Sequence, residues 1–221
     1  MKQFRRDALV IATLAVALVA SSPRVSTPAA AAAVSEDNRL VIHVLNRIGF
    51  GPRWAEVEKV QALGLQNYID LQLHPQRIPD SEMNARLTGL PTVGMSSREI
   101  AERYERPALD ARRQRKDDKP ADVSAGELPR MPDPLQQNAN TVLIELAKQK
   151  ILRAVYSERQ LEEVLTDFWF NHFNVDARKG PDRFMLTEYE RETIRPHVLG
   201  NFRNLLEATA KSPSMLFYLD N

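Results

Sequence analysis

The chain has 221 residues, of which 43% are hydrophobic and 27% charged, and its formal net charge at pH 7 is +1. This composition is that of a globular protein with one substantial core. The chain contains no cysteine. This excludes disulfide bonds, thiolate metal ligands, cysteine nucleophiles and a lipid-modified N-terminal cysteine.

The first segment has the pattern of an export signal. Basic residues that include Arg5 and Arg6 precede thirteen uncharged residues, 8–20, which are too few to span a bilayer. Alanines in an A-x-A pattern then predict a signal peptide over residues 1–33 and a mature start near Val34. The arginine pair is compatible with both the twin-arginine and the general secretion route. We therefore expect an exported protein, in the periplasm or outside the cell, with no stable transmembrane segment after cleavage.

Removal of the signal would also remove a basic excess. Residues 1–33 contain four basic side chains and one acidic one, so cleavage changes the formal net charge from +1 to −2. Nucleic-acid binding depends on cationic side chains that neutralise phosphates. We therefore expect no nucleic-acid partner.

Residues 34–90 form the N-terminal part of the predicted domain. In the segment SEDNRLVIHVLNRIGFGP, apolar residues recur at helical spacing until glycines and a proline end the helix. His43, Asn46 and Arg47 lie at i, i+3 and i+4 beside that stripe, and they form a candidate anion or ion-pair patch. The alternative is that Arg47 pairs with an acidic side chain and the glycines only terminate the helix. Two short helices hinged at Gly64 follow.

Residues 91–138 differ in composition from the rest of the chain. They are rich in charges and contain prolines at 107, 120, 129, 132 and 134. We predict a charged helix to about Tyr104, followed by a disordered, Pro-rich insertion. The run ARRQRKDDK could be a docking patch, but such runs are more often solvated loops.

Residues 139–221 form the predicted helical core. The segment NTVLIELAKQKILRAVY is amphipathic, and capping boxes at 157–160 (SERQ) and 187–190 (TEYE) each predict the start of a helix. Ser212 and Pro213 are typical of the first positions of a last helix. No segment alternates with period two for long enough to make a strand. The predicted fold class is all-α, an orthogonal array of many helices with a disordered charged insertion.

The stretch DFWFNHFNV places a histidine among four aromatic residues. The apolar row from Leu161 to Trp169 continues by three to His172, which we therefore expect on a buried face. In the structural interpretation, Asn171, His172 and Asn174 hydrogen-bond loop backbone inside the core. In the functional interpretation, they form a polar pocket. This candidate polar pocket comprises Asn171, His172, Asn174, His197 and Asp220.

A divalent metal is the sharpest chemical alternative, because neutral imidazoles and carboxylates suit zinc, manganese or iron. His172 and Asp176 lie four residues apart, and with His197 they form the candidate ligand set, in which Asp220 is an alternative to Asp176. Their spacing matches no established metal motif. Glu163 and Asp167 form a further acidic row. The charged residues 188–195 are most simply a salt-bridged, exposed face.

Several of these segments resemble the bacterial family known as domain of unknown function 1800. The resemblance is carried by HVLNRIGFGPR, by GLQNYIDLQLHP and above all by ILRAVYSERQLEEVLTDFWFNHFNV and YERETIRPHVLGNFRNLLEATAKSPSMLFYLDN, and it runs from about Arg39 to Asn221. The family-like positions are His43, Arg47, Gly49, Phe50, Gly51, Asp167, Phe168, Trp169, Asn171, His172, Phe173, Val175, Glu190, Arg191, Arg195, Pro196, His197, Ser212, Pro213, Asp220 and Asn221.

The resemblance implies an exported, largely helical protein. It also implies a partner from another exported family of unknown function, numbered 1501. Members of the family are typically about twice this length, so we expect the chain to be truncated at its C-terminal end and to expose apolar surface.

Together these observations favour an exported cell-envelope protein that binds a partner or ligand through a polar pocket in a helical core. One alternative is a metal-dependent hydrolase or oxidoreductase with histidine and aspartate ligands. Another is a nonfunctional truncated fragment, which would melt without cooperativity.

Overall fold

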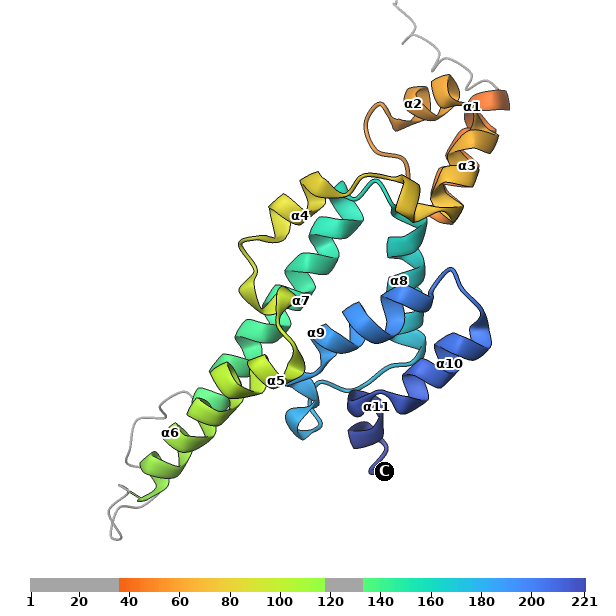
Figure 1. Cartoon of the computed structure of the whole chain (residues 1–221). Coiled ribbons are helices and arrows are strands. Elements are labelled where there is room, and N and C mark those ends of the chain that lie inside the picture. Colours follow the sequence, from red (N-terminus) through yellow and green to blue (C-terminus); the bar gives the residue numbers. More distant parts are fainter. Residues whose placement is uncertain (1–35, 118–132) are drawn as a thin grey trace, which may run out of the picture. The chain divides into compact units, whose positions relative to one another are not determined.

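The computed structural model describes residues 36–117 and 133–221, and within them the protein is all-α, with helices and no strand (Figure 1). The predicted fold class is therefore confirmed. No helix among these residues is both long enough and apolar enough to cross a membrane. The signal peptide predicted over residues 1–33 lies outside the described residues.

The first three helices share a small core of their own. They are α1 (Glu36–Ile48), α2 (Glu56–Leu63) and α3 (Leu65–Leu73). Gly64 separates α2 from α3 with a φ of 87°, a conformation that favours glycine, so the hinge predicted there is confirmed. The buried members of this core are Val41, Leu45, Val60 and Tyr68.

The charged segment is helical further than expected. After α4 (Ser81–Leu87) and the 3-10 helix η2 (Pro91–Gly94), one helical run comprises α5 (Ser97–Ile100), the π-helix η3 (Ala101–Glu105) and α6 (Arg106–Asp117). The expected helix end near Tyr104 is therefore wrong. Pro107 is tolerated because it falls in the first turn of α6, where the hydrogen-bond register changes after the π-helix. Residues 118–132 of the predicted insertion lie outside the described residues, and its last residues are helical, because the next helix begins at Pro134.

Helix α7 (Pro134–Tyr156) leads directly into α8 (Gln160–His172). The capping box predicted at residues 157–160 is wrong, because Ser157 lies at the end of α7 and Arg159 precedes α8 without a side-chain cap. The side-chain amide of Gln160 is hydrogen-bonded to other groups instead of closing a capping box with Ser157. Its Nε2 donates to the carbonyls of Ala154 and Ser157, and its Oε1 accepts from the backbone of Phe50.

Most of the remaining elements pack around the largest core, whereas Phe184 is buried in another cluster with Ile100, Ala139 and Val142. The remaining elements are the 3-10 helix η4 (Gly180–Phe184), α9 (Leu186–Glu188), the π-helix η5 (Tyr189–Ile194), the 3-10 helix η6 (Arg195–His197), α10 (Phe202–Lys211) and α11 (Pro213–Tyr218). A helix begins at Leu186, close to the start predicted from residues 187–190, but the capping box does not form, because Met185 is the N-cap and Thr187 lies within the helix. The start of α11 at Pro213, after Ser212, is as predicted. The buried core residues are Leu146, Val175, Leu186, Tyr189, Ile194, Val198, Leu205 and Met215.

Candidate functional site

Helix α8 buries a polar face rather than the apolar row expected from its sequence. Gln160, Glu163 and Thr166, spaced by three residues, are each at most 4% exposed. The apolar row that begins at Leu161 is only partly buried, and Phe168 near its end is 53% exposed. A polar face can be buried when charged partners lie opposite it. Helices α7, η5 and η6 supply such partners.

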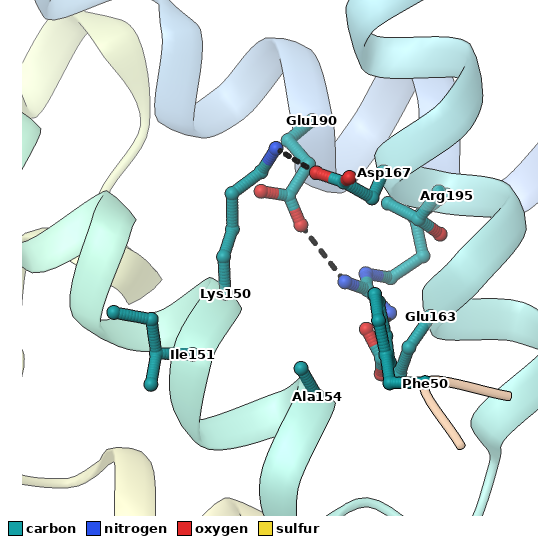
Figure 2. A pocket seen from close by; sticks show the side chains of 9 residues that line it. Phe50, Lys150, Ile151, Ala154, Glu163, Asp167, Glu190 and Arg195 are labelled. Carbon is teal, nitrogen blue, oxygen red and sulfur yellow. Dashed lines mark hydrogen bonds and ion pairs between the residues drawn. The ribbon is translucent and has the colours of Figure 1, made fainter.

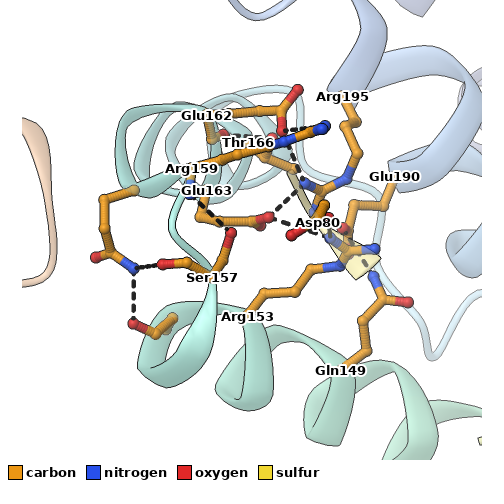
Figure 3. A network of polar contacts seen from close by, with 12 residues as sticks. Asp80, Gln149, Arg153, Ser157, Arg159, Glu162, Glu163, Thr166, Glu190 and Arg195 are labelled. Atoms are coloured by element: carbon orange, nitrogen blue, oxygen red, sulfur yellow. Dashed lines mark hydrogen bonds and ion pairs between the residues drawn. The ribbon is translucent and has the colours of Figure 1, made fainter. Parts of the chain in front are cut away.

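Arg195 is the centre of this polar network (Figure 3). Its guanidinium donates to the carboxylates of Glu163 and Glu190, each at 2.8 Å. Glu163 also accepts from Arg153 at 3.2 Å, and Gln149 donates to Glu190 at 3.0 Å. Burial lowers the pKa of Arg195, but the adjacent carboxylates outweigh burial and hold that pKa above its usual value. Arg195 therefore stays charged and joins α8 to the η5 segment.

Further charges extend the network toward its edge. Asp80 lies 3.6 Å from Arg153, and Glu162 lies 4.0 Å from both Arg159 and Arg195. Burial raises the pKa of Glu162, and the charge of Arg195 offsets part of this rise. When all its members are ionised, the network has four carboxylates and three guanidinium groups, an excess of one negative charge: Asp80, Glu162, Glu163 and Glu190 against Arg153, Arg159 and Arg195.

A pocket of about 190 Å³ opens onto this network (Figure 2). Lys150 of α7 crosses it to reach Asp167 of α8 at 2.9 Å, and the same ammonium lies 3.9 Å from the centre of the Phe170 ring. The pocket is smaller than the ~300–1,000 Å³ typical of sites for drug-sized ligands. Its lining residues are Phe50, Lys150, Ile151, Ala154, Glu163, Thr166, Asp167, Glu190 and Arg195.

Glu190 contributes a buried oxygen without a partner to the pocket wall. The residue is 0% exposed, and its Oε1 accepts from both Arg195 and Gln149. Its Oε2 is buried and has no hydrogen-bond partner among the described residues. Figure 2 shows this second oxygen turned away from Arg195. A buried carboxylate oxygen without a donor costs free energy, so a donor that reached Oε2 would be stabilised there.

The predicted patch of His43, Asn46 and Arg47 lies on the exposed side of α1. The amide of Asn46 donates to the carbonyl of Ile42 within the same helix at 2.8 Å. The glycine after this helix has the role that the structural alternative gave it, because Gly49 donates its backbone N–H to the carbonyl of Leu45 at 3.1 Å.

The structure does not bring the five residues of the candidate polar pocket together. Asn171 and His172 line an open hollow beside Phe168, whereas His197 lines a different one near α10. Asp220 is exposed and pairs with Lys179 at 2.7 Å. Asn174 is exposed as well.

The expected burial of His172 is wrong. Its ring is exposed at the end of α8 and stacks on the Phe168 ring, with centroids 6.0 Å apart and planes at 16°. The physical reason is that α8 turns its polar row, which has ionic partners, toward the protein. Phe168 and His172 are left toward the outside, whereas Leu165 and Trp169 of the same row are half-buried against the hydrophobic core.

The candidate metal ligands are also dispersed. Arg178 holds the Asp176 carboxylate with both Nε and Nη2, and this hydrogen bonding lowers the pKa of Asp176 to about 2. The ring of His197 contacts the carbonyl of Thr193 at 2.9 Å. Within residues 36–117 and 133–221, no group of three histidine, aspartate or glutamate side chains lies close enough to hold a metal ion.

Sequence analysis missed the central pair of the site. It placed residues 188–195 on an exposed face, but Glu190 is fully buried and Arg195 is only 14% exposed. One signal did point to them, since both belong to the family-like positions. A second signal lay in α7, where Gln149 and Arg153 are four residues apart and therefore lie on one face of the helix.

Comparison with known proteins identifies a family. The family model described as protein of unknown function (DUF1800) matches residues 43–221. No curated protein and no solved structure matches the chain.

Proposed function

The chain belongs to the DUF1800 family, and from its site we propose that it is an exported binding protein for a small ligand with an ammonium group. The ligand occupies the pocket between α7, α8 and η5. Export rests on the N-terminal sequence pattern, and a working partner from the family numbered 1501 rests on the resemblance alone.

The observation that carries this proposal is the unpartnered, buried Oε2 of Glu190, a residue that lines the pocket. A carboxylate oxygen accepts hydrogen bonds only, so its complement is a donor. A charged donor is favoured over a neutral one because charge-assisted hydrogen bonds are roughly twice as strong. An ammonium group therefore fits this position best.

The charge of the surroundings supports the same choice. The buried network has one more carboxylate than guanidinium group when ionised. Lys150 does not reverse this balance, since its ammonium is paired with Asp167 at 2.9 Å. A cation in the pocket would neutralise the excess charge, whereas an anion would increase it.

Two substitutions in α7 test the location. Ala154 lines the pocket, so Ala154→Phe fills it without removing a member of the ion network. Ala147 is exposed on the same helix and lies outside the pocket lining, so Ala147→Phe is the matched control. Circular dichroism melts of both variants show whether the fold is kept.

The test is calorimetric titration with small primary amines and with their neutral hydroxyl analogues. We expect binding of amines, at least about tenfold weaker binding of the neutral analogues, and loss of amine binding in Ala154→Phe but not in Ala147→Phe. Equal binding of amines and neutral analogues would overturn the proposal. Unchanged amine binding in a folded Ala154→Phe variant would overturn it too, as would the absence of amine binding at millimolar concentration.

A further inference from the structure

An open hollow adjoins the pocket along α8. It is larger than the pocket, at about 540 Å³, and shares two lining residues with it, Phe50 and Asp167. A ligand group in the pocket can therefore continue into the hollow past these two side chains. The hollow is lined by Gly49, Phe50, Val164, Asp167, Phe168, Asn171 and His172.

Exposed rings form the walls of this hollow. Phe50 is 51% exposed and Phe168 is 53% exposed, although large apolar side chains are usually buried. The ring of His172 lies nearly parallel to that of Phe168. The hollow therefore has exposed aromatic rings in its walls.

Polar groups lie along the rim between these rings. Asp167 and Asn171 are one helical turn apart on α8, and the Asn171 amide donates to the Asp167 carbonyl at 2.7 Å. Both residues line the hollow, and one oxygen of the Asp167 carboxylate is already paired with Lys150. Asp167 supplies acceptors, and the amide of Asn171 supplies both an acceptor and a donor.

Exposed rings beside polar residues in one hollow suit one ligand chemistry in particular. A pyranose ring has C–H faces that pack on aromatic rings and hydroxyl groups at its edge that need hydrogen-bond partners. A hydrocarbon chain would cover the rings but would desolvate Asp167 and Asn171 without compensation. A flat aromatic ligand without edge donors would do the same.

We propose that the pocket and the hollow together bind a short oligomer of amino sugars. One sugar residue places its ammonium against Glu190 in the pocket, and the next lies on Phe50 and Phe168 in the hollow. This inference rests on the proposed function, because the ammonium site is the same. It adds the class of ligand and a second contact surface.

The experiment compares a β-linked glucosamine disaccharide with glucosamine and with propylamine by calorimetry on the full chain. We expect the disaccharide to bind at least about tenfold more tightly than propylamine. Phe168→Ala should remove this gain and leave propylamine binding unchanged, because Phe168 lines the hollow and not the pocket. Phe217→Ala is the control, since Phe217 is also exposed but lies in α11, outside the hollow.

A second variant, Asn171→Leu, tests the polar rim separately from the rings. This substitution should weaken binding of the disaccharide and leave binding of propylamine unchanged. If propylamine binds in the pocket but the disaccharide gains nothing, the amino-sugar inference fails and the proposed function stands. If the gain persists in both Phe168→Ala and Asn171→Leu, the hollow is not its source and the inference fails. If no amine binds, both fail together.

Discussion

Among the aspartates of the described residues, Asp182 is the one whose side chain is fully buried. It is 0% exposed, it accepts one hydrogen bond from Ser214 at 3.3 Å, and its Oδ2 has no partner among those residues. Burial raises its pKa from 3.8 to about 6, although Ser214 and the charge of Lys179 offset part of the rise. The folded protein therefore holds this proton more tightly than the unfolded chain does.

This difference fixes the sign of a pH effect. The stabilisation from the bound proton is complete below pH 3.8 and is lost as the pH rises through about 6. Asp182→Asn keeps a neutral side chain at every pH. We expect the variant to match the wild type near pH 4 and to exceed its free energy of unfolding by ~2 kcal/mol above pH 7.

Urea denaturation of both proteins between pH 4 and pH 8 measures this difference in the free energy of unfolding. The contributions of the other carboxylates cancel in the difference because both proteins contain them. Asp176→Asn is the control. Its carboxylate is exposed and its pKa is lowered to about 2, so that substitution should give no rise in stability above pH 7. A constant difference between wild type and Asp182→Asn across the range would contradict the assignment.

At the scale of elements, the contact of α8 with the η5–η6 segment depends on ions rather than apolar packing alone. Arg195, at the first position of η6, is shared by Glu163 of α8 and Glu190 of η5. Removal of one partner from a buried ion pair leaves an uncompensated charge. The two carboxylates would lose their shared cation together.

We therefore predict that Arg195→Met lowers the free energy of unfolding by ~3–5 kcal/mol. The substitution keeps an apolar stem of similar length, so the loss of stability measures the effect of removing the guanidinium charge. Arg178→Met, in the exposed pair with Asp176, should cause no measurable change. Adding Glu190→Gln to Arg195→Met should recover part of the stability. A loss of less than ~1 kcal/mol would show that water screens the network.

The same contact explains what the sequence could and could not predict. The all-α class, the hinge at Gly64 and the start of α11 follow from local periodicity and turn residues, and they are confirmed. The buried face of α8 does not follow from local periodicity. Periodicity identifies an apolar face of a helix, but it does not show which face packs inward. Burial of Glu163 depends on Arg195, 32 residues later in the chain, and no local pattern reports such a partner.

At the scale of the whole described chain, separate apolar clusters are joined by polar contacts. The cluster shared by α1, α2 and α3 has its own buried residues, distinct from those around α7 and η5. Gln72 of α3, which is 3% exposed, connects this cluster to α8. Its amide donates to the carbonyl of Glu158 at 2.8 Å and accepts from the backbone of Leu161 at 3.1 Å.

This arrangement predicts that the N-terminal helices can open as a unit. Gln72→Met preserves the size of the side chain but removes both hydrogen bonds, at a cost of ~1–3 kcal/mol for the polar groups left unpaired. Local unfolding free energies differ across a structure. We expect native-state hydrogen exchange to become faster throughout α1 to α3 and to stay unchanged in α7. Gln66→Met, at an exposed position of α3, should change neither region. Equal acceleration in α3 and α7 would instead mean that the helices unfold together, with Gln72 acting on global stability alone.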